Sequence, residues 1–161
     1  MAIRRILTAA LLAGLSLSAC VGMSRSQPVT AMSPEIAAGS RINEITLQTG
    51  DDVELTADFP AIFADRVQSR LDACATGDRP LRLEARIDRL DKANPVQTAV
   101  IGGANVLRGS ARLVDPSTGQ LVGEYEIGQT VIGGRIAVVE MAEAEEQMSD
   151  AFGEELCEQA F

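Results

Sequence analysis

Three cysteines are the residues of this sequence whose chemistry is easiest to assign: Cys20, Cys74 and Cys157. Cys74 and Cys157 each fall near the end of a predicted helix, far from the C-x-x-C spacing of redox-active pairs. If the chain is exported to an oxidising compartment, we expect them to form a structural disulfide, which would stabilise the fold by about 4 kcal/mol. Two buried free thiols are the alternative, because Cys74 also lies on an apolar helix face.

Cys20 ends a pattern of another kind, in residues 1–20. Two arginines are followed by an apolar run from Ile6 to Leu17, which is shorter than the roughly 20 residues that cross a bilayer. The run closes with Leu17-Ser18-Ala19-Cys20, which resembles the lipobox of bacterial lipoproteins. That resemblance implies cleavage before Cys20, a diacylglycerol thioether on its sulfur, and acylation of its amine with palmitate. Two or three acyl chains hold a protein stably on a membrane. The alternative is an ordinary secretory signal cut near Ala19.

The composition of the remaining residues bounds the organisation of the chain. We expect a signal peptide over 1–19, a lipidated N-terminus and flexible tether over 20–40, and a single globular domain over 41–161. The tether is predicted because residues 21–40 hold Ser, Pro, Ala and Gly without a sustained period. A flexible segment of this kind would extend about 25 Å. The alternative is a first segment that is partly ordered and packs on the domain.

Acidic residues outnumber basic ones in this chain. There are 14 basic and 23 acidic side chains, and removing Arg4 and Arg5 with the leader leaves 14 − 2 = 12 against 23, a sum of −11. This balance argues against nucleic acid as a partner, because phosphates require Lys and Arg patches. It also disfavours electrostatic adsorption to anionic lipid. The lipid on Cys20 is therefore expected to provide the contact with the membrane.

Hydrophobic periodicity predicts the strands and helices within 41–161. A short strand at 45–49 precedes a helix with one apolar face: Phe59, Phe63, Val67, Leu71 and Cys74. Alternation predicts a one-side-buried strand at 81–90 and a hairpin at 106–128, which turns at residues 115–119 (DPSTG). A C-terminal helix after Gly133-Gly134 has an acidic, solvated outer face and an apolar stripe: Val138, Met141, Ala142, Met148, Phe152 and Leu156. The predicted fold is α+β, an antiparallel sheet of about four strands packed on two helices, in the order β-α-β-β-β-α.

This arrangement resembles small proteobacterial envelope lipoproteins of uncharacterised function, over about residues 41–158. The residues that carry the likeness form a strand, a D-x-x-T-G turn and a returning strand: 108–115 (RGSARLVD) and 117–122 (STGQLV). The same unit is similar to one in transporter-associated auxiliary lipoproteins. The resemblance implies a fold, and it implies no catalytic residues.

Two similar apolar segments flank the predicted hairpin, at 97–103 (QTAVIGG) and 129–134 (QTVIGG). As flexible loops they would offer a contact to a partner or a lipid-like ligand through eight residues: Val100, Ile101, Gly102, Gly103, Val131, Ile132, Gly133 and Gly134. The alternative is two strand ends that turn at permissive glycines. A phosphate site is not expected, since neither segment lies in a G-x-x-x-x-G-K-[ST] or G-x-G-x-x-G pattern.

Catalysis is not expected, and neither is a metal or another cofactor. Histidine is absent, which removes Ser-His-Asp and Cys-His catalysis and His-bearing zinc sites. Lys92 is the sole lysine and falls in a predicted polar loop, and the acidic helix lacks the D-x-[DN]-x-[DN]-G pattern of calcium loops. With one Tyr and no Trp, the sequence also lacks the aromatic platforms that a sugar site would normally offer.

Two classes of function remain. The preferred one is a non-catalytic lipoprotein on the periplasmic face of a bacterial membrane, which serves another envelope protein as a binding or structural accessory module. The alternative is a carrier for a small apolar or lipid-like ligand. Six residues distinguish the two classes. A carrier should line a pocket with several of them, whereas a module should pack them closely against one another: Leu81, Leu83, Ile87, Leu107, Phe63 and Phe152. A module should also expose an apolar patch elsewhere. Val21 is not the aspartate that favours retention in the inner membrane, so the outer membrane is preferred.

Overall fold

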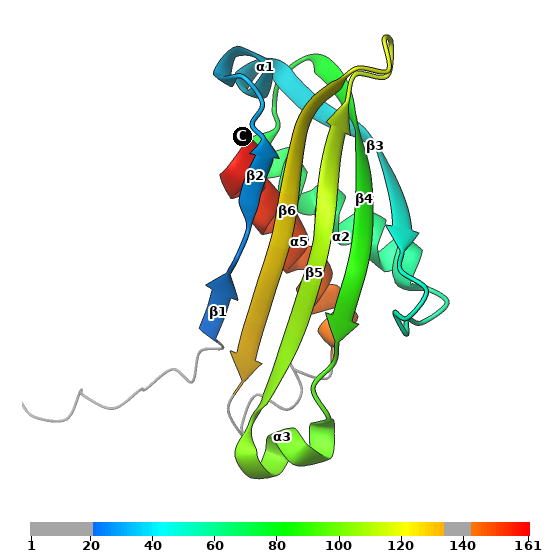
Figure 1. Ribbon diagram of the computed structural model, residues 1–161, viewed down its shortest axis with the longest axis vertical. Coiled ribbons are helices and arrows are strands. Elements are labelled where there is room, and N and C mark those ends of the chain that lie inside the picture. The colour runs from blue at the N-terminus through cyan, green and yellow to red at the C-terminus, as the bar shows by residue number, and fades with distance from the viewer. Residues whose placement is uncertain (1–20, 134–142) are drawn as a thin grey trace, which may run out of the picture.

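In the part of the chain that the structure describes, six strands form one mixed sheet, and two long helices cover one of its faces (Figure 1). The computed structural model describes residues 21–133 and 143–161. Their elements in chain order are β1 (Val21–Ser24), β2 (Gln27–Thr30), α1 (Pro34–Gly39), β3 (Ser40–Thr49), α2 (Phe59–Cys74), β4 (Arg79–Asp91), α3 (Pro95–Ile101), β5 (Gly103–Val114), β6 (Leu121–Gly133) and α5 (Ala144–Ala160). The predicted α+β class is confirmed, whereas the predicted number and order of elements are not.

The sheet order is β1-β6-β5-β4-β3, with β2 also paired to β6. β3 and β4 are parallel, from Ser40 opposite Arg79 to Thr49 opposite Ile87. The other strand pairs are antiparallel. The prediction of an antiparallel sheet of about four strands is therefore wrong in this part. The physical reason is the connection, because a crossover that contains a helix as long as α2 returns the chain to the start of a parallel strand.

The N-terminal segment is part of the sheet. β1 and β2 pair in succession with β6, and between them the Arg25 amide donates to the Gly128 carbonyl (2.7 Å). The predicted flexible tether is therefore wrong for residues 21–40, and the ordered domain includes residue 21 onward instead of beginning at 41. The predicted signal peptide over 1–19 and the predicted lipidation at Cys20 lie outside the described residues. The absence of a hydrophobic period in residues 21–40 has a physical cause. β2 is an edge strand exposed at every residue, and it contains Pro28, which edge strands tolerate.

Helices α2 and α5 pack side by side on the inner face of the sheet (Figure 1). The predicted apolar face of α2 is confirmed for four of its five members, which are buried: Phe59, Phe63, Val67 and Leu71. The fifth, Cys74, is partly buried against the core. Three residues of the predicted C-terminal stripe are also buried: Met148, Phe152 and Leu156. The other three, Val138, Met141 and Ala142, lie outside the described residues. Of the helices in the described ranges, none is both long and apolar enough to cross a membrane.

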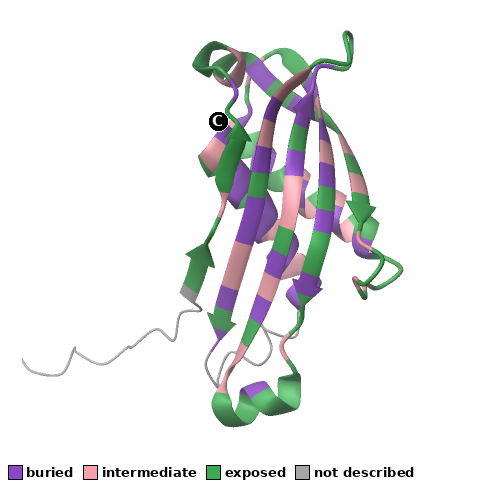
Figure 2. Cartoon of the chain, viewed as in Figure 1, coloured by how far each residue is buried: buried purple, intermediate pink, exposed green. Residues whose placement is uncertain are grey.

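The long strands bury alternate side chains against these helices (Figure 2). On β4 the predicted alternation is confirmed by four buried residues: Leu81, Leu83, Ala85 and Ile87. β5 and β6 form the predicted hairpin, which extends beyond 106–128 until Gly103 pairs with Gly133. In its turn Gly119 has a φ of +72°, a conformation that favours glycine. Alternation therefore identified both strands of the hairpin.

Candidate functional site

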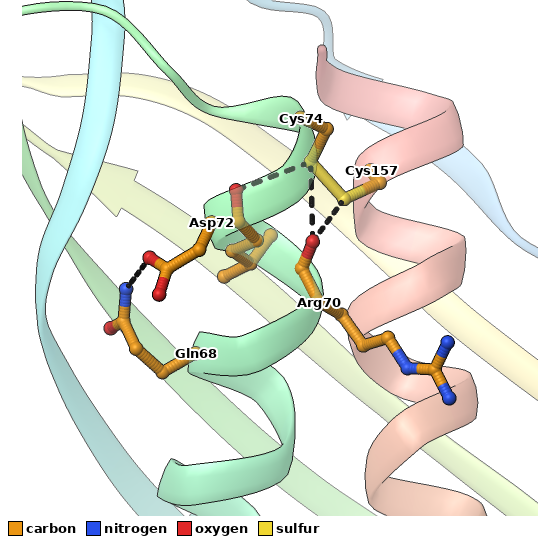
Figure 3. Close-up of a disulfide and its surroundings, with 6 residues drawn as sticks. Gln68, Arg70, Asp72, Cys74 and Cys157 are labelled. Atoms are coloured by element: carbon orange, nitrogen blue, oxygen red, sulfur yellow. Dashed lines mark hydrogen bonds between the residues drawn. A yellow bond between two sulfur atoms is a disulfide. The ribbon is translucent and has the colours of Figure 1, made fainter.

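Cys74 and Cys157 are joined by a disulfide (Figure 3). Their Cα atoms are 5.9 Å apart, and the two residues are separated by 83 positions in the sequence. The bridge ties the last residue of α2 to the last turns of α5. The Arg70 carbonyl oxygen lies 3.4 Å from Sγ of Cys157, but a disulfide sulfur has no hydrogen to donate, so this is a van der Waals contact. The predicted disulfide is confirmed, and the alternative of two free thiols is wrong.

Ion pairs join the same two helices along their length. Arg66 pairs with Glu146 and, at 3.7 Å, with Asp150, while Arg70 pairs with Asp150 at 2.9 Å. These contacts and the disulfide occur in the same order along both helices, so α2 and α5 run parallel. Gly153 permits the close approach, because a Cβ there would lie 2.8 Å from Cβ of Arg70. Each partly exposed ion pair stabilises the fold by at most about 1 kcal/mol, so the bridge and the core dominate.

The acidic side of α5 is less solvated than the sequence predicts. Glu146 and Asp150 face the arginines of α2. Glu155 is buried, and it accepts hydrogen bonds from the Ser24 hydroxyl and from Nε2 of Gln129 (3.0 Å). These contacts tie α5 to β1 and β6. Within the part of the chain that the structure describes, no group of three or more Cys, Asp and Glu side chains is arranged to hold a metal ion.

The first predicted partner loop is a short helix, α3. Val100 and Ile101 are exposed, at 59% and 68%, but they lie on this helix and not on a flexible loop, so that part of the prediction is wrong. Gly102 follows the helix with a φ of +89°, and Gly103 begins β5. Seven residues are too few to show a helical period. The available signal was Asn94 followed by proline, a typical helix start.

Polar contacts hold α3 against the end of the sheet. Asn94 caps the helix by accepting hydrogen bonds from two backbone amides (3.0 and 3.1 Å). Thr98 lies on the buried side of the helix, and its hydroxyl donates to the Asn94 carbonyl oxygen (2.8 Å). Asn105, also buried, accepts from the Ala93 amide (2.8 Å) and donates to Gln147 of α5 (2.8 Å). Sequence reasoning missed these residues, which make α3 a surface of defined position.

The second predicted partner loop is the end of strand β6. Val131 is buried, Ile132 is 43% exposed, and Gly133 is the last residue of the strand. Gly134 lies outside the described residues. Gly103 pairs with Gly133, so the structure brings the two predicted segments together. They meet as paired strand ends, which was the alternative interpretation, with α3 immediately before one of them.

Exposed apolar side chains gather at this same end of the sheet. Among the described residues six large apolar side chains are exposed, and five of them, which we call the apolar end, lie on α3, β1 and the end of β6: Val96, Val100, Ile101, Met23 and Ile132. The sixth, Val29, lies on β2 toward the opposite end (Figure 1). Cys20 is outside the described residues, but Val21, its neighbour in the chain, pairs with Ile132. Sequence reasoning missed Val96 and Met23.

The space between the sheet and the helices is filled. The six residues that would line a carrier's pocket are each 0% exposed and belong to one core cluster: Leu81, Leu83, Ile87, Leu107, Phe63 and Phe152. A surface depression lies elsewhere, and its lining is mostly charged: Asp52, Glu54, Leu90, Asp91 and Lys92. The close packing of the six residues is the arrangement expected of an interaction module and not of a carrier.

Glu145 connects three segments of the chain. Its carboxylate accepts hydrogen bonds from the Thr56 amide (2.9 Å) and hydroxyl, and it pairs with Lys92. Burial raises the pKa of the Glu145 carboxyl, but the hydrogen bonds with Lys92 and Thr56 lower it by more, so the pKa lies below its ordinary value. Lys92, the sole lysine, is thereby engaged in an ion pair that ties the segment after β4 to the start of α5.

Asp115 organises the turn between β5 and β6. Its Oδ1 accepts from the Ser117 amide (2.9 Å) and hydroxyl (2.6 Å), and its Oδ2 accepts from Nη2 of Arg79 (2.6 Å). The Ser117 hydroxyl and then the Arg79 guanidinium hold the pKa of this carboxyl far below its ordinary value. The D-x-x-T-G turn that carried the family resemblance is thus a structural feature.

Replacing Asp115 should lower stability in a pH-dependent way. Because its folded-state pKa is depressed, the carboxylate contributes fully above the unfolded-state pKa of about 3.9, and the contribution is lost as pH falls through the lower folded-state value. We therefore expect Asp115→Asn to melt below the wild type at about pH 7 and the difference to shrink below about pH 4. Thermal unfolding followed by circular dichroism measures this. Asp88→Asn, in an exposed pair with Arg86, is the control; a difference for Asp115→Asn that does not change with pH would contradict the assignment.

Solved structures of similar fold come from bacterial proteins. PelC from Paraburkholderia phytofirmans, solved as a dodecamer, is similar with a TM-score of 0.55 and 16% identity, over 88% of this chain and 99% of that one. A dodecameric single-substitution variant of PelC is similar with a TM-score of 0.56 and 15% identity, over 86% of this chain and 100% of that one. A provisionally assigned lipoprotein from Caulobacter crescentus has a TM-score of 0.48 and 12% identity, over 72% of this chain and 84% of that one. No protein-family model and no curated protein matches the sequence. At these identities the likeness to PelC concerns the fold alone.

Proposed function

We propose that this protein is a lipid-anchored, non-catalytic accessory module on the periplasmic face of a bacterial membrane, with the outer membrane as the preferred location. The lipobox-like ending at Cys20 supports the anchor. The Cys74–Cys157 disulfide supports an oxidising compartment such as the periplasm. The observation that carries the accessory role is the filled core, because the six residues that would line a carrier's pocket are each 0% exposed.

A binding module accounts for this structure better than a carrier does. A carrier needs enclosed apolar space for its ligand, and the residues that would line it are packed against one another at 0% exposure. A module needs a surface for its partner, and the sheet face away from α2 and α5, which no described helix covers, provides one (Figure 1). The partner in our proposal is an envelope protein. Further copies of this chain are included, because PelC, of similar fold, is a dodecamer.

Replacing the anchor residue tests the proposal. We expect Cys20→Ser to lose the acyl mass and to move from the membrane fraction to the soluble periplasmic fraction, because stable anchoring requires two or more acyl chains. Cys157→Ser is the matched control: it makes the same chemical change and removes the disulfide, but it should keep the acyl mass and the membrane association. Intact-protein mass spectrometry and fractionation of the envelope measure both properties.

Two results would contradict the proposal. One is a wild-type protein that retains its first methionine or carries no acyl mass. The other concerns the accessory role: crosslinking of the wild type in the envelope, followed by mass spectrometry, should recover a defined partner or further copies of this chain, and Cys20→Ser should recover less of it. If no specific crosslinked species forms with the anchored protein, the accessory role is wrong.

A further inference from the structure

The position of the first strand determines which end of the domain is next to the anchor. β1 begins at Val21, and Val21 pairs with Ile132 near the end of β6. Consecutive Cα atoms are about 3.8 Å apart, so Cys20 follows directly from this end of the sheet and no tether separates the two. Acyl chains on Cys20 would therefore hold this end of the domain at the bilayer surface.

The surface at this end is apolar. Val96, Val100 and Ile101 of α3 are 79%, 59% and 68% exposed. Val96 and Val100 lie four residues apart on one face of the helix, while Thr98 points to the opposite side, where it is buried. Figure 2 shows α3 as mostly exposed, at the end of the sheet where β1 begins. The helix therefore presents its valines outward from the fold.

The described segments that form the apolar end carry no charge of their own, in a chain that has 14 basic and 23 acidic side chains. Asp91 and Lys92, which directly precede the first of these segments, are paired with Arg89 and Glu145. Residues 93–107, which include all of α3, contain no charged side chain, and neither do residues 127–133 or β1. Charged side chains are costly to place in hydrocarbon, so an uncharged, apolar surface is what contact with acyl chains requires. The acidic remainder of the domain is repelled by anionic headgroups, which favours an orientation with only this end at the bilayer.

We propose that the apolar end, led by Val96, Val100 and Ile101 of α3, inserts into the headgroup and acyl boundary of the membrane that holds Cys20. The proposal deepens the function proposed above and rests on it. Insertion gives the domain a fixed orientation, in which the α3 end of the sheet contacts the membrane and the hairpin turn at 115–119 faces away from it. Apolar surfaces of this kind embed about 5–10 Å deep.

A single tryptophan can report this contact, because the chain contains none. V100W places it on α3, and V29W is the matched control, since Val29 is the same residue type, is 56% exposed against 59% for Val100, and lies on β2 toward the other end. Both full-length proteins are purified with their acyl chains and reconstituted into vesicles with or without brominated acyl chains. We expect V100W to shift its emission to shorter wavelength and to lose most of its intensity to the brominated lipid, while V29W is quenched only by iodide from solution. V96W, on the same face as V100W, should behave in the same way.

Each other outcome overturns the insertion. One such outcome, in protein that carries the acyl mass, is that iodide quenches V100W and V29W equally and brominated lipid quenches neither. The α3 end is then exposed to water, and only the lipid anchor contacts the membrane. If V100W is shielded from iodide but not quenched by brominated lipid, a protein partner or a second copy covers α3. If intact-protein mass spectrometry finds no acyl mass, the proposed function and the insertion are both wrong.

Discussion

Loss of the Cys74–Cys157 bridge should reduce the free energy of unfolding by about 4–5 kcal/mol, a large share of the 5–15 kcal/mol typical of a domain. The two residues are 83 positions apart, and cross-linking a loop of that length restricts the unfolded chain strongly in the chain-entropy account. The ion pairs beside it cannot compensate, because Arg66 and Arg70 are both about half-exposed. Urea unfolding of Cys74→Ser, Cys157→Ser and the double variant measures the effect.

The three variants should lose nearly the same stability, because each removes the same crosslink. Reductant supplies the control: it should destabilise the wild type by a similar amount and leave the double variant unchanged. If reductant lowers the stability of the double variant as well, or has no effect on the wild type, the bridge does not restrict the unfolded chain as described.

Phe152→Ala should have an effect of similar size, about 3–5 kcal/mol. Phe152 is 0% exposed, and its ring meets that of Phe63 nearly edge to face, with centroids 5.1 Å apart and an interplanar angle of 66°. Both rings lie at the contact between α2, α5 and the sheet, so their neighbours are held by strands and by the disulfide and collapse little into the space. A cavity that cannot collapse is the costly case.

Phe161→Ala is the matched control for Phe152→Ala. Phe161 is only partly buried against the core, so the same truncation should cost clearly less. Urea unfolding at one pH compares the two variants. Equal losses of stability at the two positions would contradict this account, because they would mean that the residues around Phe152 relax into the cavity.

The strongest sequence signals were those that repeat within one element. The four-residue spacing from Phe59 to Leu71 predicted α2, and alternation in β4, β5 and β6 predicted the strands and the hairpin. These patterns are reliable because a helix or strand buried on one face must place apolar residues at its own period. The cysteine pair was also predictable, since each member fell near the end of a predicted helix.

The missed features carry little periodicity. β2 is exposed at every residue, so nothing in its composition distinguished it from a tether. α3 is seven residues long, about two turns, and only Thr98 of it is buried. The candidate site was therefore predicted in part: Val100, Ile101 and Ile132 were named, whereas Val96, Met23 and the contacts of Asn105 were not.

By itself, the sequence determined the periodic elements, the acidic balance, the lipobox-like ending at Cys20 and the pair of cysteines left to form a bridge. Only the tertiary structure decided the direction of β3 and the pairing of residues 21–30 with β6. Strand direction and edge pairing depend on backbone hydrogen bonds between distant segments, which leave no trace in side-chain periodicity. For the same reason, only the structure placed α3 and the start of the domain at one end of the sheet.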